Sequence, residues 1–175
     1  QGLTDPCRRV DAAQPIATFQ NADSARNTGI EFELGQPIGR FLFASANYTF
    51  VDSSITLRPE QLTVQTSNER ALVGQSKNIF NVSLESSFKG FTARVLYNFL
   101  GERISEAGAN DAPDILEDSR GTVDVSLSQR IGRFNLRLNL ENLNDPIYRF
   151  KQGGLDQRTF NMGRTVALSF GVNFF

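Results

Sequence analysis

Hydrophobic and polar residues alternate along most of the chain. In residues 91–99, Phe-Thr-Ala-Arg-Val-Leu-Tyr-Asn-Phe, every odd position is apolar or aromatic and the even positions are mostly polar. A period of two is typical of a β-strand with one apolar face. Similar alternation recurs in six other segments, and no stretch of comparable length has helical spacing. We therefore predict an all-β, antiparallel protein with about seven long strands.

The connections between the predicted strands alternate between short and long. Tight turns are expected at residues 35–39, 89–90 and 131–133, and long polar loops at 57–75 and 106–117. Short turns at one end of a sheet and long loops at the other are typical of transmembrane β-barrels. The predicted strands cover residues 16–35, 40–56, 76–88, 91–105, 118–131, 133–151 and 158–175.

The spacing of the aromatic residues also favours a membrane barrel. Phe80 and Phe88 are eight residues apart, as are Phe91 and Phe99. Eight residues of a strand tilted by roughly 40° span a band about 20 Å tall, close to the apolar belt of an outer-membrane barrel. A soluble β-sandwich binding module has the same alternation and is the second alternative.

Seven strands do not close a barrel. Bacterial single-chain barrels have an even number of strands, and an open edge in lipid leaves backbone groups unpaired at several kcal/mol each. We therefore expect residues 1–175 to be a C-terminal fragment, about a third, of one larger β-barrel domain whose earlier strands lie outside it.

Composition and charge exclude several kinds of ligand and catalytic site. The chain has 18 Lys and Arg against 19 Asp and Glu, a net charge of −1, which gives no general attraction to nucleic acid. It has no His and a single Cys, Cys7, so a Ser-His-Asp triad, a Cys-His dyad and a metal cluster of several cysteines are excluded within this chain. We expect no enzyme activity, no catalytic residues, no cofactor and no metal.

Several motifs, in order, resemble the C-terminal part of TonB-dependent outer-membrane receptors. The most distinctive is Asn-Leu-Asn-Asp followed by Tyr, at residues 142–148. One departure is that the terminal Phe175 is out of step with the apolar row that ends at Phe174. The resembling segments are NADSARNTGIEFEL (21–34), ANYTFVDSS (46–54), LVGQSKNIFNVSLE (72–85), YNFLGERI (97–104), DVSLSQRIGRFNLRLNLENLNDPIYRF (124–150) and GRTVALSFGVNFF (163–175).

The resemblance implies a 22-stranded barrel in the bacterial outer membrane. Its partners would be outer-membrane lipid, an N-terminal plug domain and, through the N-terminal part of the receptor, TonB; neither of the last two is contained in these residues. The family actively takes up scarce nutrients such as siderophore-bound iron, cobalamin or oligosaccharides. A passive porin or another kind of outer-membrane barrel is the first alternative.

Two groups of polar residues are candidate contact sites. The first is an acidic stretch of a long loop, which we expect to contact a small-molecule ligand, although a solvated loop of turn-forming residues is the simpler interpretation: Asn110, Asp111, Asp114, Glu117 and Asp118. Its spacing matches no calcium loop. The second group is expected on the lumen face, towards the plug: Arg94, Asn98, Arg137, Asn139 and Glu141.

Overall fold

The structure is a computed structural model that describes residues 21–174. Cys7, Phe175 and the first part of the predicted strand 16–35 lie outside the described residues. Strands dominate the described chain, and the single turn of 3-10 helix η2 covers Pro59–Thr63. No helix in residues 21–174 is long and apolar enough to cross a membrane.

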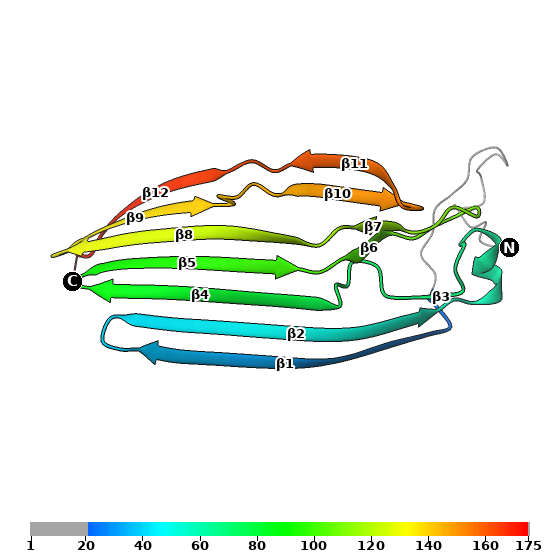
Figure 1. Cartoon of the computed structure of the whole chain (residues 1–175), viewed down its shortest axis with the longest axis horizontal. Helices are drawn as coiled ribbons and strands as arrows, with labels where there is room; N and C mark the ends of the chain where they lie inside the picture. The colour runs from blue at the N-terminus through cyan, green and yellow to red at the C-terminus, as the bar shows by residue number, and fades with distance from the viewer. Residues whose placement is uncertain (1–20, 175) are drawn as a thin grey trace, which may run out of the picture.

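The strands form two sheets that follow one another along the long axis of the molecule (Figure 1). The main sheet has the order β1-β2-β4-β5-β8-β9-β12, with β3 paired to β2, and the smaller sheet has the order β11-β10-β7-β6. The strands are β1 (Ser24–Ile38), β2 (Leu42–Thr56), β3 (Glu69–Arg70), β4 (Asn78–Phe88), β5 (Phe91–Leu100), β6 (Arg103–Glu106), β7 (Ile115–Glu117), β8 (Arg120–Ile131), β9 (Phe134–Glu141), β10 (Ile147–Gln152), β11 (Leu155–Asn161) and β12 (Thr165–Val172).

The prediction of about seven long antiparallel strands is confirmed. Three of the predicted strands are divided into two strands each, β5 with β6, β9 with β10 and β11 with β12, whereas the predicted strand 118–131 corresponds to β8 alone. The loop predicted at residues 106–117 was wrong in part, because its last three residues form β7, which pairs with β6 and β10. The breaks occur where backbone groups leave the ladder. At one break the Gly101 amide donates to the Asn78 carbonyl at 2.8 Å, and at another the Leu143 amide donates to the Val123 carbonyl at 2.8 Å. The last predicted strand begins at Leu155 rather than at 158.

The turn predicted at residues 35–39 was wrong in position. Strand β1 continues to Ile38, and the turn lies at residues 39–41. Pro37 remains in the strand because β1 is an edge strand of the described sheet, where a residue without an amide hydrogen is tolerated. Gly35 also remains in the strand, where the ring of Phe43 lies over it, 3.0 Å from the position of an added Cβ.

The register gathers the apolar positions of all the long strands on one face. Phe32 lies opposite Tyr48, which lies opposite Phe80, which in turn lies opposite Phe99. Near the tight turns, Phe88 pairs with Phe91. The two aromatic rows therefore bracket the apolar face, as the spacing of eight residues predicted. Between them lies an aliphatic row from five adjacent strands, namely Leu84, Val95, Val125, Leu140 and Val166.

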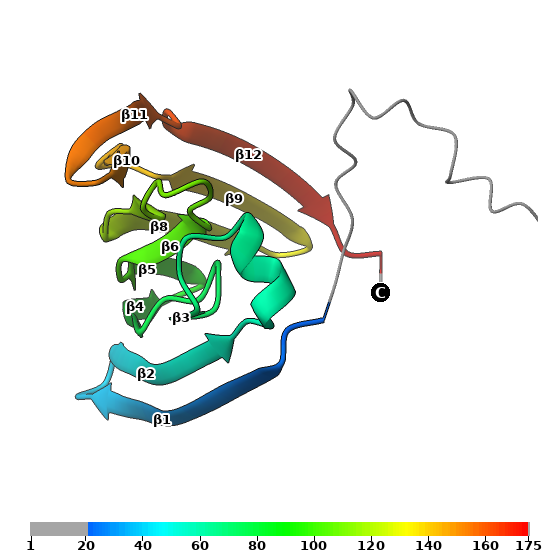
Figure 2. The ribbon, with the colours of Figure 1, turned by 90° about the vertical axis from the view of Figure 1, so that its right-hand side faces the viewer.

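The apolar face is not covered by a second layer of described residues. Phe32 is 63% exposed and Leu168 is 70% exposed. Viewed from the loop end, the main sheet curves into an open arc from β1 to β12 (Figure 2). A β-sandwich would bury this face between two sheets, so the arrangement disagrees with the sandwich alternative.

The core sits at the loop end of the molecule. The buried hydrophobic side chains are Leu57, Ile104, Ile115 and Phe150. They come from the smaller sheet and from the loop that follows β2, on the right in Figure 1. The long strands thus hold the smaller sheet and loop 57–75 together at one end.

We predict that Gly90→Ala destabilises the barrel more than Gly132→Ala. Both glycines have positive φ, 80° and 59°, so alanine at either position costs about 1–2 kcal/mol. At Gly90 an added Cβ would also lie 2.9 Å from the Arg130 carbonyl oxygen, whereas at Gly132 nothing lies within 4 Å. Urea unfolding of both variants measures the difference. Equal losses of stability would show that the ladder next to Gly90 adapts freely.

Candidate functional site: the polar face and the loop end

The face opposite the apolar one has polar side chains bonded across neighbouring strands. The hydroxyls of Ser45 and Ser83 lie 2.7 Å apart, and the Asn81 amide donates to the Asn47 side-chain oxygen at 2.7 Å. These residues are directly opposite one another in the register of β2 and β4. Cross-strand hydrogen bonds of this kind supplement the backbone ladder and keep the side chains in place.

The five residues predicted for the lumen all lie on this polar face. Arg94 forms an ion pair with Glu85 at 2.5 Å, and Asn98 donates to Asp124 at 3.2 Å. Asn139 accepts a hydrogen bond from Ser126 at 2.8 Å.

Some of these residues are brought together and one is not. A recess of about 270 Å³ on the polar face is lined in part by Arg94, Asn139 and Glu141, together with Asp124. Asn98 reaches this recess through its bond to Asp124. Arg137 lies nearer the tight turns, opposite Ser128 and Ser169. The orientation of this face towards a lumen stays a prediction.

The segment Asn142–Asp145 joins the polar face to the loop end. Asn142 and Asp145 both have positive φ, at 58° and 42°, so the chain turns out of the ladder here. The Asn142 amide donates to the Asp124 carboxylate at 2.8 Å, and its side-chain amide donates to the Gly163 carbonyl at 2.6 Å. Asn144 bonds Val123 and Gly121 of β8 at 2.9 and 2.7 Å. This most distinctive motif of the sequence is therefore a junction between strands.

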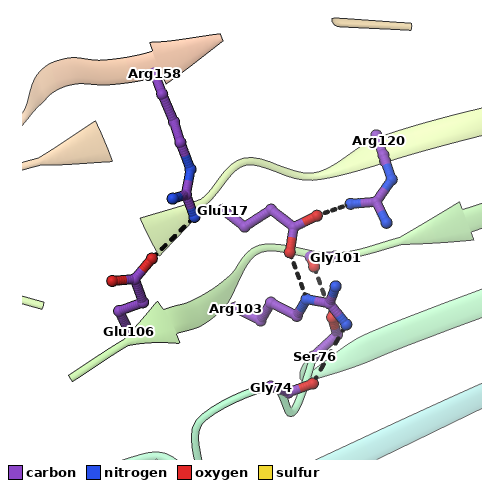
Figure 3. Close-up of polar contacts among 8 residues, drawn as sticks. All are labelled: Gly74, Ser76, Gly101, Arg103, Glu106, Glu117, Arg120 and Arg158. Atoms are coloured by element: carbon purple, nitrogen blue, oxygen red, sulfur yellow. Dashed lines mark hydrogen bonds and ion pairs between the residues drawn. The ribbon is translucent and has the colours of Figure 1, made fainter. Parts of the chain in front are cut away.

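A buried carboxylate organises the loop end. Glu117 in β7 is 5% exposed and lies between Arg103 of β6 and Arg120 of β8 (Figure 3). Arg103 Nε donates to one oxygen at 2.6 Å, and Arg120 Nη1 donates to the other. A buried carboxylate is tolerated when both of its oxygens are bonded to cations. Arg103 also reaches the Gly74 carbonyl at 3.4 Å, which ties loop 57–75 to this ion-pair cluster.

Stacked side chains extend from this cluster across the smaller sheet. The Arg120 guanidinium lies 4.2 Å from the centre of the Tyr148 ring. Tyr148 stacks on Phe160 at 5.3 Å, and Phe160 stacks on Phe150 at 5.8 Å. Arg158 lies over Phe150 at 4.1 Å and forms an ion pair with Glu106 at 2.9 Å. Cation–π contacts and ring stacking therefore connect β8, β10 and β11.

The acidic residues predicted as loop contacts are not gathered into one cluster. Asp114 accepts a hydrogen bond from the Gly108 amide at 2.6 Å, Glu117 is the buried carboxylate described above, and Asp118 pairs with Lys151 at 2.8 Å. Asn110 and Asp111 are exposed and both have positive φ, 52° and 67°. In residues 21–174 there is no group of three or more acidic, His or Cys side chains able to hold a metal ion.

One residue that the sequence did not single out is Arg70, in β3 of loop 57–75. Its Nε and Nη1 atoms are buried and have no hydrogen-bond partner in the described structure. Buried N–H groups without hydrogen-bond partners are costly. No periodicity marks Arg70, because its burial depends on how the loop folds back onto β2, where it pairs with Ile55.

A single layer of long antiparallel strands, apolar on one face and polar on the other, is the arrangement of a transmembrane β-barrel wall. A family model described as "TonB dependent receptor-like, beta-barrel" matches residues 3–143. The chain therefore belongs to the TonB-dependent receptor β-barrel family, and the resemblance predicted from its motifs is confirmed.

A comparison with solved structures supports the same fold. The chain is similar to the ferric yersiniabactin uptake receptor FyuA from Yersinia pestis, with a TM-score of 0.63 and 20% sequence identity over 86% of this chain. The match covers 24% of the FyuA chain, so this chain spans about a quarter of that receptor. No curated protein matches the sequence.

We predict that Glu117→Ala destabilises the loop end strongly, because it leaves Arg103 and Arg120 without their shared carboxylate. Breaking a buried ion pair costs about 3–5 kcal/mol. Glu106→Ala removes one partner of the more exposed pair with Arg158, and should cost no more than about 1 kcal/mol. Urea unfolding monitored by heat-modifiable gel migration compares the two variants. Similar losses would mean that burial of Glu117 contributes little.

Proposed function

We propose that this chain forms part of the wall and extracellular loops of an outer-membrane receptor that takes up a scarce nutrient in a TonB-dependent manner. The observation that carries the proposal is the register. It sorts the apolar and polar residues of seven long strands onto opposite faces, with aromatic rows at both margins of the apolar face. Membership of the TonB-dependent receptor family supports the same role.

On this proposal the apolar face contacts outer-membrane lipid. Transfer of exposed Val, Leu and Phe side chains from water into lipid contributes about 1.5–3 kcal/mol each. The polar face lines the lumen and contacts an N-terminal plug domain of the complete receptor, with Arg94, Asn98, Arg137, Asn139 and Glu141 among the contact residues. The role is transport and recognition of cargo, not an enzymatic reaction.

We propose ferric siderophores as the cargo class, with cobalamin and oligosaccharides as the other classes the family carries. The name of FyuA, a ferric yersiniabactin uptake receptor with the same fold, supports this choice. The contact residues would be Asn110, Asp111 and Arg70, from loops that an isolated bridge between Gln65 and Ala109 joins. Asp114, Glu117 and Asp118 would act indirectly, because their carboxylates are bonded within the loop end.

The cargo proposal is tested by uptake. The full-length receptor that contains this chain is expressed in a bacterial strain that lacks siderophore receptors of its own. Uptake of radioactive iron is then measured for a panel of siderophores. We expect uptake of at least one siderophore, abolished when TonB is deleted. Uptake that persists without TonB would favour the passive porin alternative.

Within that assay, Arg70→Gln should weaken binding of the transported siderophore at least about tenfold, since a hydrogen bond to a charged group contributes about 1.5–3 kcal/mol. Arg26→Gln is the matched control, because Arg26 is an exposed cation near the same end of the sheet and bonds only Thr28 among the described residues. Equal binding by both variants would remove Arg70 from the contact site.

The orientation of the two faces is tested by a pair of neighbouring substitutions. Val95→Arg places a charge on the apolar face and should cost about 2–4 kcal/mol near the bilayer midplane. Arg94→Val lies one residue away on the polar face and should be tolerated better. The yield of assembled, heat-modifiable barrel in outer membranes measures both. Equal yields would mean that the two faces are wrongly assigned.

A further inference from the structure

The charged side chains at the tight-turn end of the sheet, among the residues that the structure describes, are all cations. The turn between β1 and β2 contains Arg40, the turn between β4 and β5 contains Lys89, and Arg130 and Arg133 flank the turn between β8 and β9. The surrounding segments 36–43, 86–93 and 128–136 contain no Asp or Glu. The three turns lie together at the left end in Figure 1.

These four cations have no carboxylate partner within the described residues. The ion pairs of the described chain lie along the polar face, as for Arg94 with Glu85, or towards the loop end, as for Lys151 with Asp118. All four cations are exposed. Within the described part of the chain, the tight-turn end therefore presents a positive potential that no carboxylate offsets, while most acidic residues lie towards the loops.

Two of the four cations, Arg40 and Lys89, lie at the margin of the apolar face. Arg40 lies over the ring of Phe41 at 5.8 Å, and Lys89 lies over the ring of Phe88 at 5.1 Å. Phe41 and Phe88 pack edge to face at 5.3 Å, and Phe88 pairs with Phe91 across the hairpin. Each charge is thus held next to an aromatic ring at the border between the apolar face and solvent. Cationic side chains in this position reach towards lipid head groups while their stems cover apolar surface.

The other two cations line a hollow at the same end. Arg130 and Arg133, with Asn173 and Phe174, border a recess of about 660 Å³. The Asn173 amide is bonded to the Arg133 carbonyl at 2.8 Å, which fixes the end of β12 against this turn. Two guanidinium groups and an amide beside an aromatic ring match the chemistry of a phosphate attached to an acyl chain.

We propose that the tight-turn end is a docking surface for anionic phospholipids of the periplasmic leaflet. Their phosphate groups would contact the basic rim formed by Arg40, Lys89, Arg130 and Arg133, and their acyl chains would lie against the adjoining Phe41, Phe88 and Phe91. The positive rim would fix the depth of the wall in the membrane by attraction to the head groups. This inference rests on the proposed membrane location.

The test uses the purified full-length receptor in neutral detergent. Native mass spectrometry counts bound phosphatidylglycerol and phosphatidylcholine with identical acyl chains. The wild type should prefer phosphatidylglycerol, and the preference should fall as the salt concentration rises. Each cation near an anionic surface contributes about fivefold in affinity, so the quadruple variant R40Q/K89Q/R130Q/R133Q should lose at least about tenfold of this preference.

The matched control removes the same number of charges from the opposite end. The control variant R26Q/R58Q/K77Q/R149Q should keep the wild-type preference, because these partly or fully exposed cations lie towards the loops. The charge-preserving variant R40K/R130K/R133K should also keep it. If the quadruple variant does not assemble, Arg40→Gln and Lys89→Gln singly should each reduce the preference about fivefold.

Three results would overturn the inference. One is equal binding of the two lipids by the wild type. Another is equal loss in the rim variant and the control. The third is competition by inorganic phosphate or by a polyglutamate peptide at concentrations that match the lipid, which would indicate a site for a soluble anion or an acidic partner. Incorporation into neutral lipid vesicles is measured separately. Failure there would contradict the membrane location, whereas insertion without lipid preference would contradict this inference alone.

Discussion

Each long strand is held in one register by the requirement that its apolar residues share a face with those of its neighbours. A shift by one residue would move every side chain of a strand to the other face. Here the constraint extends over seven strands. The aromatic row of Phe32, Tyr48, Phe80 and Phe99 runs from β1 to β5, and the aliphatic row that begins at Leu84 continues from β4 to Val166 in β12. In lipid the same ladder is also required to satisfy the backbone amides and carbonyls. The polar pairs, the recess around Asp124 and the position of the loops all depend on this register.

The backbone hydrogen-bond ladder of the strands ends where the loops begin, and polar side chains bind the backbone groups there. Asn142 and Asp145 turn the chain out of β9 and bond the neighbouring strands, so the groups released from the ladder keep partners. Beyond this junction the smaller sheet is stabilised by the buried Glu117 and its two arginines. Different interactions thus stabilise the wall and the loop end. The wall depends on the alternation that places apolar residues on one exposed face, whereas the loop end depends on burial and on charge pairing.

The charges are distributed along the long axis of the sheet. Ion pairs are concentrated at the loop end, and the tight-turn end has four cations without a carboxylate partner among residues 21–174. A net charge of −1 conceals this separation, just as an average composition conceals the two faces of each strand. In a member of the TonB-dependent receptor family, the two ends would lie in different surroundings. The loop end has paired charges, whereas the tight-turn end has cations alone.

Periodicity was sufficient to determine the strands and their two faces, because alternation is a local property of the chain, whereas the family was indicated by the resemblance of several motifs. It misplaced the first turn, since Pro37 and Gly35 read as turn residues but are accommodated in an edge strand beneath the ring of Phe43. The sequence listed the polar residues of this loop as one group, but only the tertiary structure separated the exposed Asn110 and Asp111 from the buried Glu117. Burial of Glu117 requires Arg103 and Arg120 to come from two other strands, and burial of the Nε and Nη1 atoms of Arg70 likewise requires the loop to fold back on β2. Such contacts between distant segments leave no period in the sequence, so only the tertiary structure could decide them.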